Sequence, residues 1–266
     1  MESNNAAAPE ARDVALPIFY RRPRPVDRER DRGWSLQPTP DVRYARATNS
    51  VLLGAAEFAR AMHSYPIVFT STEPRVAVAV LGLDGDQNLF VGEDGKWREG
   101  NYIPAYVRRY PFVYANDDVN KQMVLCIDRA AEFIVDGGDM PFFENGQPSE
   151  YTKACMEFCN NFEMERQRTM SFVQLLKDLD LFELKTATFT PPTQEGQPPA
   201  EPQKIAEYFG VSEEKLNKLP TDKYIELRDN GALAQIYAHL LSLVGWDRLV
   251  ALAIAKQTAP PQAANQ

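Results

Sequence analysis

The sequence between Tyr65 and Tyr114 decides the fold. It reads YPIVFTST over residues 65–72, AVLGLDGDQNLFVGEDGKW over 79–97 and NYIPAYVRRYPFVY over 101–114. Short runs of β-branched and aromatic residues alternate here with Gly-Asp and Asp-Gly pairs, and the pattern continues to about Val135. Such runs, separated by turn residues, are typical of strands in an antiparallel sheet. Gly95 can take a positive φ angle, so that a hairpin turn is predicted around it.

Helical patterns begin after this stretch. Ser149 is expected to cap a helix that continues to Leu179. Its apolar stripe follows helical spacing and comprises Cys155, Phe158, Phe162, Thr169, Val173 and Leu176.

Beyond that helix, alternation over residues 181–190 predicts a strand. A helix over 222–230 would end at Gly231, and a helix over 232–256 would break at Gly245. Another helix is expected before the sheet, from Leu53 to His63. The sequence therefore predicts an α+β fold, with an antiparallel β-sheet from the N-terminal half packed against helices mainly from the C-terminal half.

Three segments rich in proline, alanine and polar residues show neither the helical nor the strand pattern. Residues 1–15 and 258–266 are predicted to be disordered, and residues 191–203 to form a flexible proline-rich insertion. Since 266 residues suffice for one large domain, residues 16–257 are expected to form a single α+β domain.

The composition narrows the class of protein. Hydrophobic residues make up 44% of the chain, which is enough to fill a sizeable core. The formal net charge of −8 argues against a nucleic-acid binder. The N-terminus has no basic region followed by an apolar stretch, and the longest apolar runs are too short to span a bilayer. We therefore expect a soluble, cytoplasmic protein without membrane insertion.

Metal and cofactor chemistry finds little support in the sequence. Only His63 and His239 are available as histidines, and Cys155 and Cys159 lie four residues apart without a CxxC motif. The cysteine pair is either a redox or metal pair or, as we favour, two small buried side chains on one helix face. No catalytic residue, no metal site and no cofactor is predicted.

The arginine pair Arg108–Arg109 is the most conspicuous candidate for binding. On the predicted strand the two side chains would point to opposite faces, one to solvent and one to the core or a pocket. A buried guanidinium needs a carboxylate or an anionic ligand. An internal salt bridge with Asp128 or Glu57 is the favoured interpretation, and an anion-binding wall is the alternative.

A candidate ligand site follows from packing the sheet on the last helix. Both segments carry more polar-tipped aromatic residues than a plain core uses. In the alternative interpretation these residues only fasten sheet to helix, and His239 is a satisfied, buried histidine. The candidate ligand-binding residues are Tyr102, Tyr106, Arg108, Arg109, Tyr237, His239 and Trp246.

The order of short motifs resembles the SapC family of bacterial proteins over roughly residues 17–256. The matching pieces include PIFYRRPRPVDRERDRGW, EFARAMHSYPIVFTS, VAVLGLDGDQNLFV, YIPAYVRRYPF and GALAQIYAHLLSLVGWDRLVALA. Related proteins are often encoded near TonB-dependent receptors and flavin-dependent halogenase-like enzymes. The resemblance thus implies an accessory role in nutrient uptake or in modifying a small molecule or peptide, and it supplies no catalytic residues.

Two functions from different classes remain after these considerations. The first is a non-catalytic binding or accessory protein for a small molecule, a peptide or a partner enzyme. The alternative is a cofactor-independent enzyme that uses an Arg/Tyr pocket on an anionic substrate. Because no nucleophile–base pair or cofactor motif is legible, the binding protein is favoured.

Overall fold

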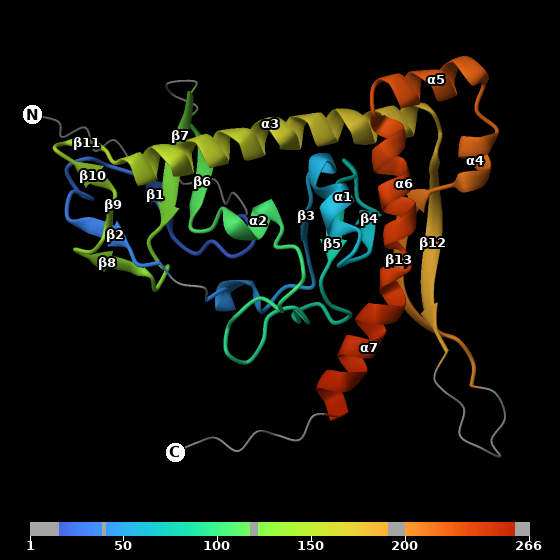
Figure 1. Ribbon diagram of the computed structural model, residues 1–266, viewed down its shortest axis with the longest axis horizontal. Helices are drawn as coiled ribbons and strands as arrows, with labels where there is room; N and C mark the ends of the chain where they lie inside the picture. The colour runs from blue at the N-terminus through green and yellow to red at the C-terminus, as the bar shows by residue number, and fades with distance from the viewer. Residues whose placement is uncertain (1–15, 39–40, 118–121, 191–199, 259–266) are drawn as a thin grey trace, which may run out of the picture.

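The computed structural model describes residues 16–38, 41–117, 122–190 and 200–258 (Figure 1). The predicted disorder of residues 1–15 lies outside these ranges, as does most of the predicted tail and most of the proline-rich insertion. At their edges, Thr258 still belongs to a helix and Gln203 already belongs to a strand.

The larger part of the molecule is built on a five-stranded antiparallel sheet with the order β12-β13-β4-β5-β3. β12 and β13 form a long hairpin that extends past the other strands (Figure 1). Only Phe209 and Phe69 pair β13 with β4. The strands are β3 (Ser50–Leu52), β4 (Ile67–Phe69), β5 (Ala77–Val80), β12 (Phe182–Phe189) and β13 (Gln203–Val211).

The smaller part consists of short antiparallel strands at the other end of the molecule (Figure 1). A sheet with the order β1-β7-β6 lies beside one with the order β8-β2-β9, and β10 pairs with β11. The strands are β1 (Pro23–Pro25), β2 (Trp34–Leu36), β6 (Phe112–Asp117), β7 (Gln122–Asp128), β8 (Ile134–Asp136), β9 (Met140–Pro141), β10 (Phe143–Glu144) and β11 (Gln147–Pro148).

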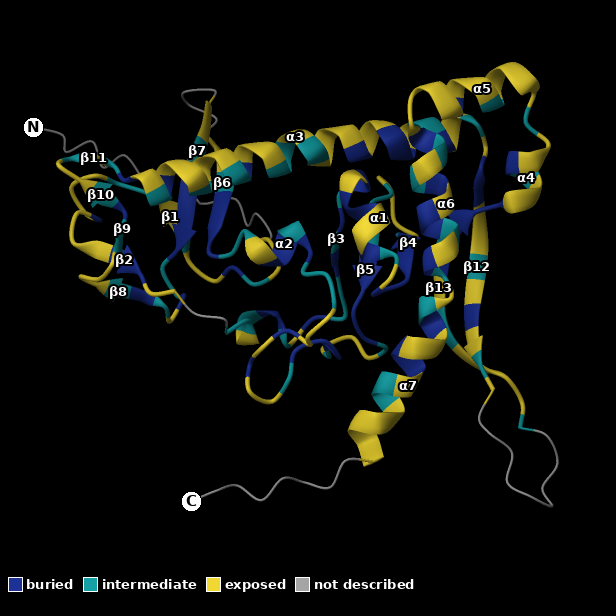
Figure 2. Ribbon diagram, viewed as in Figure 1, coloured by how far each residue is buried: buried dark blue, intermediate teal, exposed yellow. Residues whose placement is uncertain are grey.

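Helix α3 (Glu150–Asp178) runs along both parts (Figure 1). The side chain of Ser149 accepts a hydrogen bond from the backbone N–H of Thr152, which confirms the predicted cap. The helix contacts β6, β9 and β11 in the smaller part and the short 3-10 helix η2 (Ala55–Glu57) in the larger one. Its face toward the sheets is buried and its outer face is exposed (Figure 2).

Four helices follow the hairpin: α4 (Glu213–Asn217), α5 (Thr221–Asp229), α6 (Ala232–Ser242) and α7 (Gly245–Thr258). Gly231 separates α5 from α6 with a φ of 82°, a conformation that glycine adopts without strain. The predicted break before α7 is confirmed at Gly245. A Cβ there would lie 3.1 Å from the backbone nitrogen of Pro66, so the helix approaches that loop closely.

The apolar stretch from Ala232 to Thr258 is longer than the sequence suggested. Taken together, its 27 residues are by length and composition apolar enough to cross a bilayer, and 33% of their most apolar part is buried within the protein. The absence of membrane insertion stays a prediction, because length and composition alone do not decide it. Within the protein, α6 packs on β4, β13 and the short helix α1 (Phe58–Ala61).

The α+β prediction is confirmed, with antiparallel sheets mostly from the N-terminal half and the main helices from the C-terminal half. Two details differ. The predicted single sheet is divided among several smaller sheets, and strand β13 was not anticipated. The helix expected over 53–63 is a 3-10 turn followed by the single turn of α1.

The predicted strand through Arg108 and Arg109 is wrong, because this segment forms helix α2 (Ala105–Arg108). The backbone N–H groups of Val107 and Arg108 both donate to the carbonyl oxygen of Pro104. The N–H of Ala105 donates to Glu57 Oε1 at 2.7 Å. A carboxylate from a distant segment thus satisfies a first-turn amide that no local residue reaches.

Gly82 is a position where any side chain should disturb the fold. A Cβ there would lie 1.7 Å from the carbonyl oxygen of Gln87, within the turn that follows β5. We expect Gly82→Ala to lower the free energy of unfolding by about 1–3 kcal/mol, as overpacking does. Gly85→Ala is the matched control in the same turn, because its Cβ would meet nothing within 4 Å. Urea titrations of both variants check this, and equal midpoints would contradict it.

Candidate functional site

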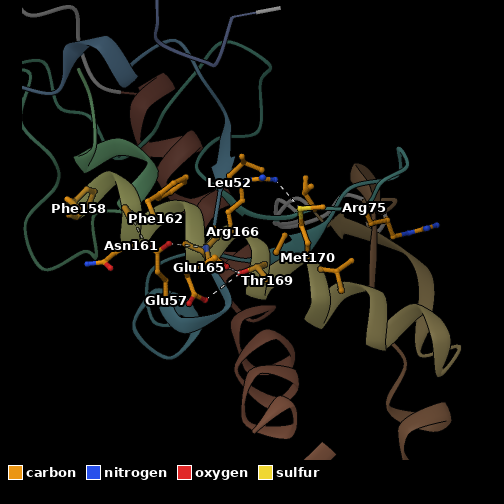
Figure 3. A pocket seen from close by; sticks show the side chains of 16 residues that line it. Leu52, Glu57, Arg75, Phe158, Asn161, Phe162, Glu165, Arg166, Thr169 and Met170 are labelled. Carbon is orange, nitrogen blue, oxygen red and sulfur yellow. Dashed lines mark hydrogen bonds between the residues drawn. The ribbon is translucent and has the colours of Figure 1, made fainter. Parts of the chain in front are cut away.

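A cavity of about 230 Å³ lies between α3 and the strands β3 and β5 (Figure 3). For comparison, an engineered cavity of about 150 Å³ in another protein holds benzene. The walls of the cavity between α3 and the sheet are mainly apolar. The principal apolar side chains are Leu52, Val76, Phe158, Phe162, Met170 and Val173.

Three polar side chains of the cavity lining, from Glu57, Glu165 and Thr169, bond to backbone N–H groups at the start of η2. The N–H groups at the start of a helix have no partners within the helix, and here side chains supply them. Gly54 N–H donates to Glu57 Oε2 at 2.9 Å, and Ala56 N–H donates to Glu165 Oε1 at 2.9 Å. Between them, Ala55 N–H donates to the Thr169 hydroxyl at 2.8 Å. These groups fix the wall of the cavity.

Arg108, the last residue of α2, and Arg109, which follows it, each lie over an aromatic ring of the cavity lining. The guanidinium of Arg108 lies over Phe158, 5.2 Å from the ring centroid, and that of Arg109 lies 4.4 Å from the centroid of Phe162. Arg109 is also 4.3 Å from the ring of Tyr106. Such cation–π contacts hold a ring in one orientation.

The predicted salt bridges of these arginines are wrong. Arg108 reaches Glu57 only indirectly, because Arg108 Nη2 donates to the Tyr102 hydroxyl, which donates to Glu57 Oε1 at 2.9 Å. Among the described residues Arg109 has no carboxylate partner, and its buried Nε has no hydrogen-bond acceptor. Asp128 is occupied by other donors.

Four of the predicted site residues therefore lie together beside the cavity: Tyr102, Tyr106, Arg108 and Arg109. The other three lie apart from it, on α6 and α7. Tyr237 is exposed, with its hydroxyl 3.2 Å from that of Tyr224, and Trp246 is buried with its ring centroid 5.5 Å from that of Tyr208.

His239 is fully buried and both of its ring nitrogens are used. Nε2 accepts a hydrogen bond from Val211 N–H at 3.0 Å, and Nδ1 lies 2.7 Å from the carbonyl oxygen of Ile67. Because Nε2 accepts, Nδ1 carries the proton and donates to that oxygen. Burial lowers the pKa of His239 to about 4, so the ring is neutral at pH 7 and joins β13, β4 and α6.

The family model of SapC matches residues 26–249 of the 266-residue chain. The chain belongs to the SapC family. Comparisons with curated proteins and with solved structures gave no match.

In this SapC protein, the cavity residues on α3 were visible in the sequence only as an apolar stripe. Phe158, Phe162 and Val173 have the helical spacing of core residues, and nothing in that spacing distinguishes a filled interface from an open one. Met170, which the sequence analysis did not single out, is 44% exposed and lies at the cavity. Methionine adapts its shape readily and is common at surfaces that bind varied apolar groups.

The cysteine pair on α3 of the SapC protein consists of free thiols. Cys159 lies on the buried face of α3. Burial raises the pKa of its thiol to about 12, which keeps the thiol protonated at pH 7. Burial also raises the pKa of Cys155. Within the described residues, no group of three or more His, Cys, Asp or Glu side chains could hold a metal ion.

Proposed function

We propose that this SapC-family protein is a binding protein that holds an apolar group in the cavity between α3 and the five-stranded sheet. The group would belong to a small molecule or to a side chain of a peptide. The observation that supports this is the combination of apolar walls with neighbouring polar groups already bonded to the backbone of η2. Burial of apolar surface would then provide most of the affinity.

The polar groups at the cavity favour binding over catalysis. A general base or nucleophile must have a free lone pair within reach of the substrate. Glu165 and Thr169 are held in place by the backbone N–H groups that they accept, Arg166 is paired with Glu163, and no nucleophile–base pair is seen among the described lining residues. The alternative of a cofactor-independent enzyme for an anionic substrate therefore receives less support from this cavity.

An accessory role is part of the same proposal. A protein that holds an apolar group without transforming it can pass the ligand to a partner enzyme or take it from an uptake system. The family resemblance suggests this accessory role. We propose that the protein acts in the cytoplasm.

The proposal predicts that Met170→Trp weakens binding of a neutral apolar probe. N-phenyl-1-naphthylamine, followed by its fluorescence, should bind the wild-type protein saturably and be displaced by toluene. The indole ring of Met170→Trp would occupy the cavity, and we expect at least a tenfold weaker Kd, which corresponds to about 1.4 kcal/mol. Leu52→Trp, on the opposite wall, should have the same effect.

Met164→Trp is the matched control. Met164 lies on the same helix, is 42% exposed against 44% for Met170, and does not line the cavity. Its Kd should stay within twofold of the wild-type value. Equal weakening by Met164→Trp and Met170→Trp, or no saturable binding to the wild-type protein, would refute the proposed site.

A further inference from the structure

A second cleft, of about 440 Å³, has Arg108 in its lining and shares no lining residue with the apolar cavity. Its size is within the usual range of small-molecule sites. Its lining includes residues from the loop after β2, from the segment before α2 and from the start of α3. Its aromatic lining consists of Tyr44, Trp97, Tyr110, Phe133 and Tyr151.

Two cations that have no carboxylate partner also line this cleft. Within the described residues, neither Lys96 nor Arg108 forms an ion pair. Arg108 uses Nε for the carbonyl oxygen of Ile103 at 3.0 Å and Nη2 for the hydroxyl of Tyr102 at 3.2 Å. Within the described residues, Nη1 of Arg108 donates no hydrogen bond, so its N–H groups are available to a ligand.

The one carboxylate in the lining does not cancel this charge. Asp41 accepts hydrogen bonds from the backbone N–H and from Nη1 of Arg43, so its charge faces a cation of its own. The cleft thus keeps an excess of positive charge in a chain whose formal net charge is −8. Lys96 and Arg108 are both exposed, so a ligand can reach them, and a cleft with low-dielectric walls focuses the field of the charges in its lining.

We propose that this cleft is a binding site for a small anionic molecule that carries an aromatic ring. Lys96 and Arg108 would bind its carboxylate or phosphate group, since both side chains pair with such anions. The aromatic side chains would pack against its ring, as offset or edge-to-face contacts. This site is separate from the apolar cavity and is carried by its own observation.

Arg108 also connects the two sites. Its guanidinium lies over Phe158 and bonds to Tyr102, whose hydroxyl bonds to Glu57, and both Phe158 and Glu57 line the apolar cavity. Lys96 has no such connection. Substitution of Lys96 therefore tests the anion site without disturbing the cavity.

The test compares phenylacetate with phenylacetamide, which differ mainly in charge, by isothermal titration calorimetry. Phenyl phosphate is a third probe that distinguishes phosphate from carboxylate recognition. We expect one or both anions to bind at least tenfold more tightly than phenylacetamide. Lys96→Gln and Arg108→Gln should each weaken the anion at least fivefold, and Arg108→Lys should retain part of the affinity.

Arg98→Gln is the matched control. Arg98 is exposed on the same loop as Lys96 and does not line the cleft, and its substitution changes the net charge as much as Lys96→Gln does. Its anion affinity should stay within twofold. Lys96→Gln should also bind N-phenyl-1-naphthylamine as the wild type does, so the two proposed sites can fail separately. Equal affinity for anion and amide, or equal weakening by Arg98→Gln and Lys96→Gln, would overturn the anion site.

Discussion

Replacing Asp128 with alanine is expected to lower the free energy of unfolding by about 3–5 kcal/mol. The carboxylate is fully buried and accepts four hydrogen bonds. Its donors are the backbone N–H groups of Arg21, Arg22 and Ala130, at 2.9, 2.8 and 3.0 Å, and the hydroxyl of Tyr110 at 3.2 Å. Alanine would leave all four donors without this acceptor.

Urea unfolding measures the effect, with Asp139→Ala as the control at an exposed aspartate. The control should change stability by no more than about 0.5 kcal/mol, as exposed substitutions usually do. Because Asp128 holds the segment before β1, trypsin should also cleave Asp128→Ala faster after Arg21. A loss below about 1 kcal/mol would show that the four hydrogen bonds contribute little net stability.

His239 should make the protein less stable in mild acid. Its pKa is about 4 in the folded protein, below the ordinary value of 6.5 that it recovers on unfolding. Between these values the unfolded chain binds a proton that the folded protein excludes. Stability is therefore complete above pH 6.5 and decreases as pH falls, by about 3 kcal/mol at pH 4.

The measurement is the difference in unfolding free energy between pH 7 and pH 4. His239→Gln is expected to be less stable at pH 7, because Val211 N–H and the Ile67 carbonyl lose their partner. It should, however, lose about 3 kcal/mol less than the wild type on acidification. His63→Gln, at the exposed histidine, should follow the wild-type curve. Identical slopes for wild type and His239→Gln would assign the acid sensitivity to other groups.

The parts of the fold that were predicted correctly depend on signals a few residues long. Ser149 caps α3 with its own side chain, and Gly231 ends α5 through its positive φ angle. Both are local chemistry that a sequence displays directly. The break before α7 was likewise indicated by Gly245 itself, although its close approach to Pro66 was not visible in the sequence.

The parts that were missed depend on partners far away in sequence. Helix α2 carries valine and tyrosine, which suit a strand equally well, and its first amide is satisfied by Glu57, 48 residues earlier. The cavity is formed where α3 fails to fill the space against β3 and β5, which helical spacing alone does not reveal. The predicted grouping of Tyr237, His239 and Trp246 with the arginines failed to allow for α3, which lies against α2 instead.

The unbroken course of α3 also limits how the chain can change in length. One added residue near its middle would turn everything after it by about 100° about the helix axis. Cys159 would keep its place against the smaller sheets while Thr169 swung away from Ala55, and the cavity wall would turn with it. The intact helix thus fixes the rotation of one part of the molecule relative to the other.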